Sequence, residues 1–262
     1  MTAPAIAIIQ ARMSSTRLPG KALMPLAGKP IIWHIVDRAR ACQLVGKVVV
    51  ATSEEESDTP LADYCHREQI DCYRGSLNNV MSRYLEVLNS HSYNYFVRIT
   101  GDCPLIHPPF IDSQIEALIL NDGDAIRTDF ASTLLEGQGV HSSRSLRWVA
   151  EHSEHPDDLE HVGSRYFTER ASEFRLVGLR IPKHLRENQW RLTVDEEPDY
   201  QLISVIYDEL FSGEIIPLEN VVNFLKKNTH LGLINKDVNH SAINQELAAK
   251  RGDQQPNLVG LA

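Results

Sequence analysis

The segment ARMSSTRLPGK, residues 11–21, contains three cationic side chains and three hydroxyl groups but no acid. Guanidinium groups, hydroxyls and backbone N–H groups can share the oxygens of one phosphate, and each charge-assisted hydrogen bond contributes on the order of 1.5–3 kcal/mol. The segment follows the apolar run of residues 5–9, so we expect it to leave the end of a strand. It predicts a phosphate-binding loop, with a solvated surface loop as the alternative. The candidate contacts are Ala11, Arg12, Ser14, Ser15, Thr16, Arg17 and Lys21.

Two familiar phosphate-binding motifs are absent from this segment. A P-loop requires G-x-x-x-x-G-K-[ST], but Ser15 stands at its first glycine and Ala22 at its last position. The dinucleotide fingerprint G-x-G-x-x-G is missing as well. The segment therefore favours neither a P-loop ATPase nor a dehydrogenase.

Two aspartates, Asp102 and Asp195, each follow a run that we expect to form a strand. In a parallel α/β sheet, ligands bind beyond the carboxyl ends of the strands, so both aspartates would face the cationic loop. Magnesium is commonly held by one or two carboxylates together with substrate phosphates. The pair predicts a magnesium site, although either aspartate alone is more typical of a turn or a helix cap. The sequence DGD at residues 122–124 imitates a D-x-D metal motif, but its position between a predicted helix and strand indicates a turn.

The segment YRGSLNNVMSRY, residues 73–84, joins a short predicted strand to a predicted helix. Arg74 and Ser76 lie at the end of the strand, and Arg83 lies one turn into the helix. A ligand contact and an ordinary strand-to-helix turn are equally good interpretations. The eleven histidines show no HExxH spacing, so most are expected on the surface or in packing.

Strand and helix patterns alternate along the first half of the chain. The expected strands are residues 5–9, 47–52, 95–100 and 124–129, with the later runs FRLVGLRIP and WRLTVD as further candidates. The expected helices are residues 30–41, 60–68, 79–89, 109–120 and 198–210, with a helix-rich stretch over 145–173. This alternation predicts an α/β fold with a doubly wound, mainly parallel sheet in three layers, which is Rossmann-like. Residues 130–143 fit neither pattern.

Composition excludes several classes of protein. The chain has 262 residues, of which 42% are hydrophobic, and its net charge of −9 argues against a broad nucleic-acid or anionic-membrane surface. No run approaches the ~18–20 apolar residues of a membrane span, and no export signal is recognisable. Four cysteines without a C-x-x-C pair are typical of the reducing cytoplasm.

No internal repeat or low-complexity linker divides the chain. We expect a single domain over residues 1–230, with residues 130–190 as its acceptor-site and dimerisation subregion. Residues 231–262 form a polar C-terminal tail.

Five segments resemble, in order, the cytidylyltransferases of the spore-coat polysaccharide F-like type, relatives of the synthetases of CMP-Kdo and CMP-sialic acid. These segments are IIQARMSSTRLPGKAL, VVVATS, YRGS..NV..RY, RITGDCPLI and LTVDEEPDY, and the similarity spans residues 5 to about 212. The first and fourth segments are specific to the family.

The resemblance implies a nucleotidyltransferase fold, usually a homodimer, that uses CTP and Mg²⁺ to activate a sugar acid or related acceptor for polysaccharide biosynthesis. It implies that the loop holds the triphosphate, with Lys21, Arg12 and Asp102 as catalytic residues and Asp102 and Asp195 on the metal. Further nucleotide contacts would come from Thr52, Arg74, Ser76 and Thr100, and acceptor contacts from Arg83, His141 and His161.

The chain departs from the family pattern at two points. Glu197 occupies the usual place of a proline, which is displaced to Pro198. The segment LLEGQGVHSS lacks acidic residues that many relatives carry between its glycine and its serines, and this segment would line the sugar pocket.

Two alternative functions stay open. One is a glycosyltransferase that uses a nucleotide-sugar donor, and the other is a non-catalytic nucleotide sensor.

Overall fold

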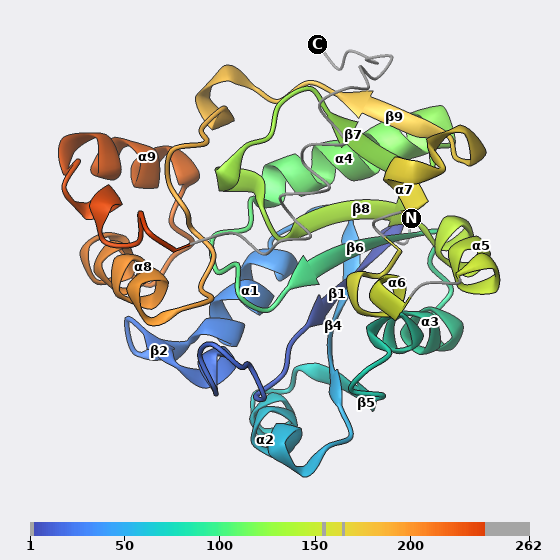
Figure 1. Ribbon diagram of the computed structural model, residues 1–262, viewed down its shortest axis with the longest axis horizontal. Helices are drawn as coiled ribbons and strands as arrows, with labels where there is room; N and C mark the ends of the chain where they lie inside the picture. The colour runs from blue at the N-terminus through green and yellow to red at the C-terminus, as the bar shows by residue number, and fades with distance from the viewer. Residues whose placement is uncertain (1–2, 154–155, 164–165, 239–262) are drawn as a thin grey trace.

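The computed structural model describes residues 3–153, 156–163 and 166–238. A seven-stranded sheet in the order β5-β4-β1-β6-β8-β7-β9 lies at its centre (Figure 1). The strands of this sheet are β1 Ala5–Gln10, β4 Val45–Ser53, β5 Asp71–Gly75, β6 Tyr95–Thr100, β7 Ala125–Thr128, β8 Gln138–Ser142 and β9 Leu176–Leu179. A small antiparallel ribbon is formed by β2 Pro25–Leu26 and β3 Lys29–Pro30.

Helices cover both faces of the sheet. They are α1 Ile31–Arg40, α2 Thr59–Arg67, α3 Val80–Ser90, α4 Pro108–Asn121, α5 Ser143–His152, α6 Pro156–His161, α7 Tyr166–Glu169, α8 Glu197–Leu210 and α9 Leu218–Lys227. β1 shows why both faces need cover, because its residues from Ala5 to Ile9 are fully buried. Its odd-numbered residues pack with α1, α4 and α8, and its even-numbered residues pack with α3 and α5. Three layers result, and the fold prediction is confirmed.

The sheet is mainly parallel, as predicted. β5, β4, β1 and β6 run parallel to one another, and β7 runs parallel to β9. β8 is antiparallel to both β6 and β7. The sequence analysis assigned no element to β8, because its residues QGVHS are neither uniformly apolar nor strictly alternating.

One predicted strand is wrong. Residues 190–195, WRLTVD, form no strand, although Trp190, Leu192 and Val194 are all buried. Side chains satisfy polar groups of this segment: the Asn235 side chain donates to the Arg191 carbonyl, and Asp199 accepts from the Asp195 amide. The segment is therefore held by side-chain contacts, which a strand pattern does not reveal.

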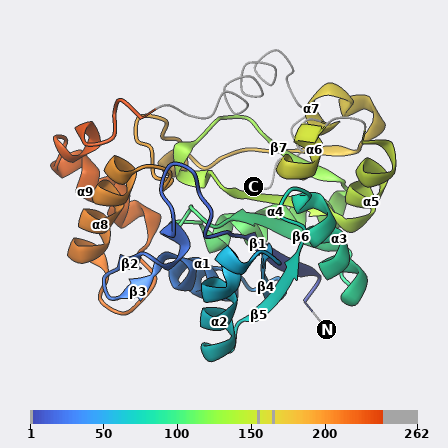
Figure 2. The same cartoon turned by 60° about the horizontal axis from the view of Figure 1, so that its bottom comes forward.

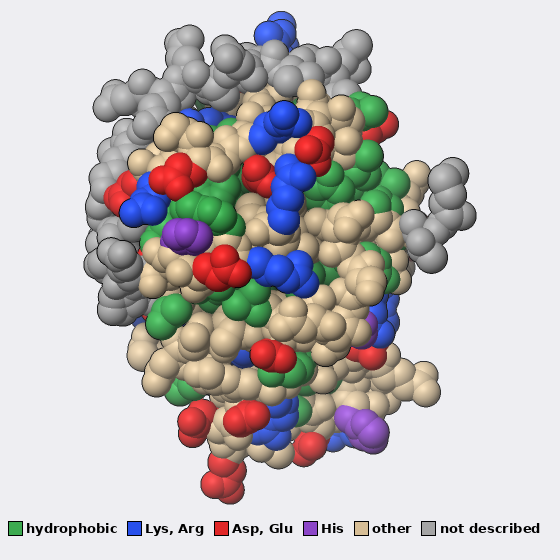
Figure 3. All heavy atoms as spheres, turned by 90° about the vertical axis from the view of Figure 1, so that its right-hand side faces the viewer, with side chains coloured by type: hydrophobic (Ala, Val, Ile, Leu, Met, Phe, Trp, Pro, Cys, Tyr) green, Lys and Arg blue, Asp and Glu red, His purple; other side chains and the backbone are tan. Residues whose placement is uncertain are grey.

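The described helices include none that is long and apolar enough to cross a membrane. On the side of the molecule that lies at the right of Figure 1, Lys and Arg side chains are interspersed with Asp and Glu (Figure 3). The DGD turn carries ion pairs, since Arg144 pairs with Asp122 at 2.7 Å and with Asp124 at 2.8 Å.

The division into one domain over residues 1–230 and a tail stays a prediction. Most of that tail, residues 239–262, lies outside the described residues.

Candidate active site

The cationic loop leaves the carboxyl end of β1 and is fixed at both ends by backbone hydrogen bonds. The Ala11 amide donates to the Ala51 carbonyl at 3.3 Å, and the Gly20 amide donates to the Met13 carbonyl at 2.8 Å. Gly20 has a φ of 77°, a left-handed conformation that favours glycine. The chain then enters a single turn of 3-10 helix at Lys21. Figure 2 shows this loop in dark blue, extending beyond the end of β1.

The buried carboxylate of Asp58 holds the loop from the turn of 3-10 helix, Glu56–Asp58, that follows β4. It accepts hydrogen bonds from the Met13 amide at 2.6 Å, the Ser53 amide at 3.1 Å and the Thr52 hydroxyl at 3.0 Å. Burial acts to raise the pKa of Asp58, but these hydrogen bonds and one from the Ser53 hydroxyl outweigh it and hold the pKa below its ordinary value. The sequence analysis missed Asp58, because no local pattern links it to a loop 45 residues away.

Lys21 lies among three oxygens that come from two distant segments. Its Nζ donates to Asp102 Oδ2 at 3.0 Å, to Asp195 Oδ1 at 3.0 Å and to the Val194 carbonyl at 2.8 Å. Asp102 follows β6, and the Val194 amide donates to the Asp102 carbonyl at 2.8 Å, which ties the two segments together. We call the group formed by Lys21, Asp102, Asp195 and the Val194 carbonyl the cation nest.

Further contacts hold Asp195 in the cation nest. Arg17 pairs with Asp195 Oδ1 at 3.0 Å, and the nearly buried Arg191 pairs with Oδ2. Arg191 also pairs with the fully buried Asp199 at 3.1 Å. Asp195 thus meets three cationic side chains, and its position is set by packing rather than by the end of a strand.

The cation nest has the chemistry of a site for a divalent cation. Two carboxylate oxygens and one carbonyl oxygen already converge on a single positive group, and hard oxygen ligands of this kind suit magnesium. Among the described residues, no group of three His, Cys, Asp or Glu side chains could hold a metal by itself. Asp102, Asp195 and the Val194 carbonyl are the groups here that could hold such a cation.

The charges of the cation nest support one another. Burial acts to lower the pKa of Lys21, but the carboxylates of Asp102 and Asp195 outweigh it and raise the pKa. Burial acts to raise the pKa of Asp102, but Lys21 and hydrogen bonds from Thr100 and Cys103 outweigh it and lower the pKa. Both groups are therefore stabilised in their charged forms.

These shifts predict how stability depends on pH. The contribution of Asp102 is present above its ordinary pKa of 3.8 and is lost as the pH falls through the lowered value. The contribution of Lys21 is present below its ordinary pKa of 10.5 and is lost only as the pH rises through the raised value. We expect Asp102→Asn to flatten the acid limb of the unfolding free energy, measured by urea denaturation from about pH 6 to about pH 2. Equal acid limbs in the variant and the wild type would rule out this contribution.

A family model described as Cytidylyltransferase matches residues 6–202 of the chain. The chain belongs to the cytidylyltransferase family. This cytidylyltransferase is 29% identical over 225 residues to the spore coat polysaccharide biosynthesis protein SpsF of Bacillus subtilis (strain 168), covering 84% of this chain and 93% of SpsF. It is 36% identical over 155 residues to a 3-deoxy-manno-octulosonate cytidylyltransferase of Geobacter sulfurreducens, covering 53% of this chain and 61% of that protein.

Solved structures of similar proteins share the fold. A cytidylyltransferase from Leptospira borgpetersenii serovar Hardjo-bovis matches with a TM-score of 0.79 at 26% identity, covering 90% of this chain and 99% of that one. A CMP:2-keto-3-deoxy-manno-octonic acid synthetase complexed with CTP matches with a TM-score of 0.56 at 15% identity, covering 78% and 98%. The second likeness concerns the fold alone.

The remaining loop residues of the cytidylyltransferase differ in whether they contact the cation nest. Arg17 also contacts Glu196 at 3.3 Å, whereas Arg12 points to Glu160 at 3.7 Å and stands apart from the nest. Thr16 is exposed. The Ser15 hydroxyl lies 3.4 Å from the Leu18 amide, and the Ser14 hydroxyl is buried without a hydrogen-bond partner in the described structure. Such an unsatisfied hydroxyl is costly unless a ligand engages it.

The candidate base-side residues make mostly structural contacts in this state. The Arg74 guanidinium donates to the Ser53 carbonyl at 3.0 Å and to the Glu55 carbonyl at 2.9 Å. The Ser76 hydroxyl accepts from the Asn79 amide at 3.1 Å, and the Thr100 hydroxyl lies 3.2 Å from Cys103 Sγ. Their roles toward a nucleotide stay predictions.

The three candidate acceptor contacts lie on three different elements, and their roles toward an acceptor stay predictions. Arg83 is buried against the end of β4, where it donates to the Ala51 carbonyl at 3.0 Å. His141 is stacked between Phe96 and Phe167, at ring distances of 5.4 and 4.9 Å. His161 is the last residue of α6 and is half-buried.

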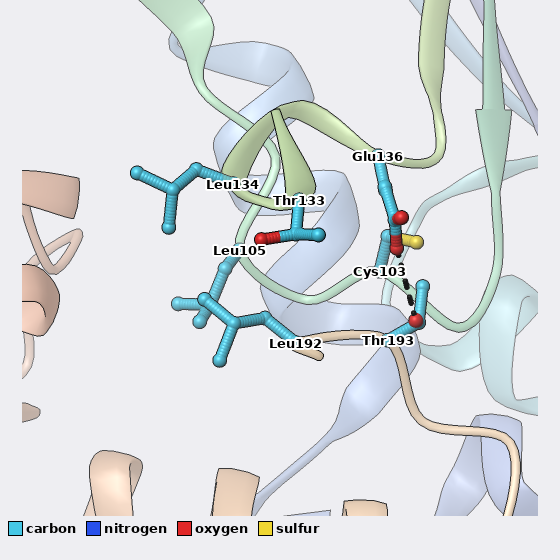
Figure 4. Close-up of a pocket in the computed structure, with 7 residues that line it drawn as sticks. All are labelled: Cys103, Leu105, Thr133, Leu134, Glu136, Leu192 and Thr193. Atoms are coloured by element: carbon cyan, nitrogen blue, oxygen red, sulfur yellow. Dashed lines mark hydrogen bonds between the residues drawn. The ribbon is translucent and has the colours of Figure 1, made fainter. Parts of the chain in front are cut away.

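A small hollow lies beside the cation nest. Its lining includes Cys103 and Thr193, which are the chain neighbours of Asp102 and Val194. Figure 4 shows the Glu136 carboxylate pointing toward the Thr193 hydroxyl, at 3.3 Å, while Leu105, Leu134 and Leu192 gather on the other side. Sequence reasoning missed Glu136, because the surrounding segment has no periodic pattern.

Proposed function

We propose that this cytidylyltransferase transfers CMP from CTP to a hydroxyl group of a sugar acid and releases pyrophosphate, for polysaccharide or glycan biosynthesis. The observation that carries the proposal is the cation nest beside the cationic loop. Carboxylates that converge on one cation, next to arginines with open donors, suit a triphosphate and its metal ion. The names of the relatives, SpsF and 3-deoxy-manno-octulosonate cytidylyltransferase, support a sugar-type acceptor.

The proposed reaction needs no protein nucleophile. The acceptor oxygen attacks the α-phosphorus of CTP, a new P–O bond forms, and the bond to the bridging oxygen breaks. Pyrophosphate leaves with that electron pair, and the acceptor hydroxyl loses its proton. Catalysis is then positioning together with stabilisation of the charge that develops on the phosphates.

Each part of the site has a task in this proposal. Arg12, Arg17 and the loop amides bind the triphosphate, and Lys21 offsets charge on the transferred group. Asp102 and Asp195 would hold magnesium. When bound, magnesium would neutralise phosphate charge and orient the leaving group. Lys21 and the metal would compete for the same oxygens, so the lysine ammonium would turn toward the triphosphate in the loaded site.

The test of the function is pyrophosphate release from CTP in the presence of magnesium and a panel of sugar acids. We expect release that depends on one class of sugar acid. Activity only with a UDP- or GDP-sugar would instead indicate a glycosyltransferase. The D-x-D sequence of this chain lies in a turn, where Asp122 and Asp124 both pair with Arg144. Tight CTP binding without turnover on any acceptor would indicate a nucleotide sensor.

The nucleotide preference is a separate prediction. We expect CTP to raise the melting temperature more than ATP, GTP or UTP, because the matching family model and the named relative are cytidylyltransferases. Thermal shift with the four triphosphates at equal concentration measures it. Equal shifts would contradict a cytosine-selective site.

Two further features belong to the proposal. We propose that the enzyme acts as a homodimer through residues 130–190 and that it works in the cytoplasm. Four free cysteines are compatible with a reducing compartment. Light scattering of the purified protein measures the oligomeric state, and a monomer would contradict the first of these features.

A further inference from the structure

Arg98, near the end of β6, is a half-buried arginine to which the proposed function assigns no task. In the sheet it stands between Ile8 of β1 and Gly139 of β8. It lies two residues before Thr100, the last residue of β6, and four before Asp102 in the cation nest. Two strand residues, about 7 Å, separate Arg98 from the end of β6, and Asp102 of the cation nest follows two residues later in the turn after the strand.

The guanidinium group of Arg98 is held in place by a buried relay. Its Nε donates to Gln10 Oε1 at 3.2 Å, and the hydroxyl of Tyr84 lies 3.1 Å from the same oxygen. Tyr84 is fully buried, and burial raises its pKa to about 12, so the phenol keeps its proton. Gln10 accepts from Nε, and the Arg98 side chain also hydrogen-bonds Tyr84, so the guanidinium is held in a fixed direction with further N–H donors available.

The charge of Arg98 has no counterion in the part of the chain that the structure describes. No carboxylate of these residues forms an ion pair with it, whereas Arg17, Arg144, Arg186 and Arg191 each pair with an aspartate. Partly desolvating a cation without a counterion costs free energy. A guanidinium that is held in place without a counterion can bind an anion with little loss of side-chain freedom.

Gly139 leaves space on the strand next to Arg98. A Cβ placed on Gly139 would have only one heavy atom within 4 Å, His141 Nε2 at 3.4 Å. Gly139 lies in β8, whose residues QGVHS include no acid. The neighbourhood of Arg98 is therefore both open and free of acidic side chains from this strand.

We propose that Arg98 binds the carboxylate of the acceptor and that Gly139 provides the room for it. This inference rests on the proposed function and specifies which end of the acceptor lies where. The carboxylate would lie over β6 and β8 at Arg98, and the attacking hydroxyl would lie at the cation nest. Arg98 is thus assigned to acceptor selection and has no part in holding CTP.

The test uses Arg98→Met, Arg98→Lys and Gly139→Ala with Arg40→Met as the control. Loss of one charge-assisted interaction of about 1.5–3 kcal/mol corresponds to a change of roughly 10- to 150-fold. We expect Arg98→Met to raise the KM for the sugar acid by this factor while the Kd for CTP changes less than about twofold. Arg98→Lys keeps the charge but loses the planar guanidinium, so its KM should lie in between. Gly139→Ala should raise the acceptor KM. Arg40→Met replaces an exposed arginine at the end of α1 and should change neither constant.

Two results would overturn the assignment of Arg98. One is an unchanged acceptor KM in an Arg98→Met variant whose melting temperature equals that of the wild type. The other is a loss of CTP affinity as large as the loss of acceptor affinity, which would place Arg98 on the nucleotide. A wild type that releases pyrophosphate only with acceptors lacking a carboxylate would overturn this inference but leave CTP-dependent transfer intact. Absence of turnover with every acceptor would overturn the proposed function, and this inference with it.

Discussion

Replacing Lys21 by methionine is expected to lower kcat by about a hundredfold or more, because loss of one preorganised charge stabiliser typically costs ~10²–10³. The same change should strengthen binding of a divalent cation in the absence of nucleotide. The Lys21 ammonium lies at 2.8–3.0 Å from three oxygens that the metal would use, so its removal frees them. Titration with Mn²⁺, followed by electron paramagnetic resonance, measures this second effect independently of turnover.

The chain offers a matched control for Lys21. Lys47 pairs with Asp71 at 3.0 Å on the edge of the sheet away from the cation nest. Lys47→Met removes a lysine from a comparable ion pair and should change neither kcat nor Mn²⁺ affinity. Near-normal turnover in Lys21→Met, or unchanged Mn²⁺ affinity, would place Lys21 outside the reaction.

Asp102→Asn and Asp195→Asn are each expected to abolish turnover. A neutral amide does not offset the charge of the metal, and excess magnesium should restore little. Both variants should still bind CTP weakly through Arg12 and Arg17. Steady-state pyrophosphate release and isothermal titration calorimetry separate the two effects.

The double variant tests whether the two aspartates serve one cation. Because either loss disables the same site, the double variant should lose little more activity than each single variant. Asp71→Asn, the partner in the control ion pair, should remain fully active. A double variant whose loss equals the product of the single losses would show two independent roles.

The first half of the fold was predictable because it is specified by local patterns. The apolar runs of β1, β4 and β6 are buried on both faces, and the helices between them carry one apolar face each. β8 was not predictable in this way. Its position in the sheet depends on pairing with β6 and β7, and its residues Gln138, Gly139 and His141 carry no strand signal of their own.

The candidate site was predictable in part, and one premise was wrong. Strand topology correctly places Asp102 at the sheet edge that carries the cationic loop. Asp195 reaches the same point from a segment that is not a strand, held by Arg17 and Arg191. Its presence beside Asp102 depends on tertiary contacts rather than on the strand end that the sequence suggested.

Other parts of the site had no local signal. Asp58 braces the loop, and Gln10 orients Arg98, through contacts between residues far apart in the sequence. The Val194 carbonyl belongs to the backbone, so no residue type announces it. Such contacts follow from how the elements pack and need the three-dimensional structure to be seen.

We infer that the cation nest and the cationic loop together hold CTP with its metal. The decisive measurement is the structure of a crystal soaked with CTP and magnesium. We expect the triphosphate against Arg12, Arg17 and Lys21, a metal between Asp102 and Asp195, and the Lys21 ammonium displaced from its three oxygens. A nucleotide bound elsewhere, with Lys21 still paired to both aspartates, would contradict it.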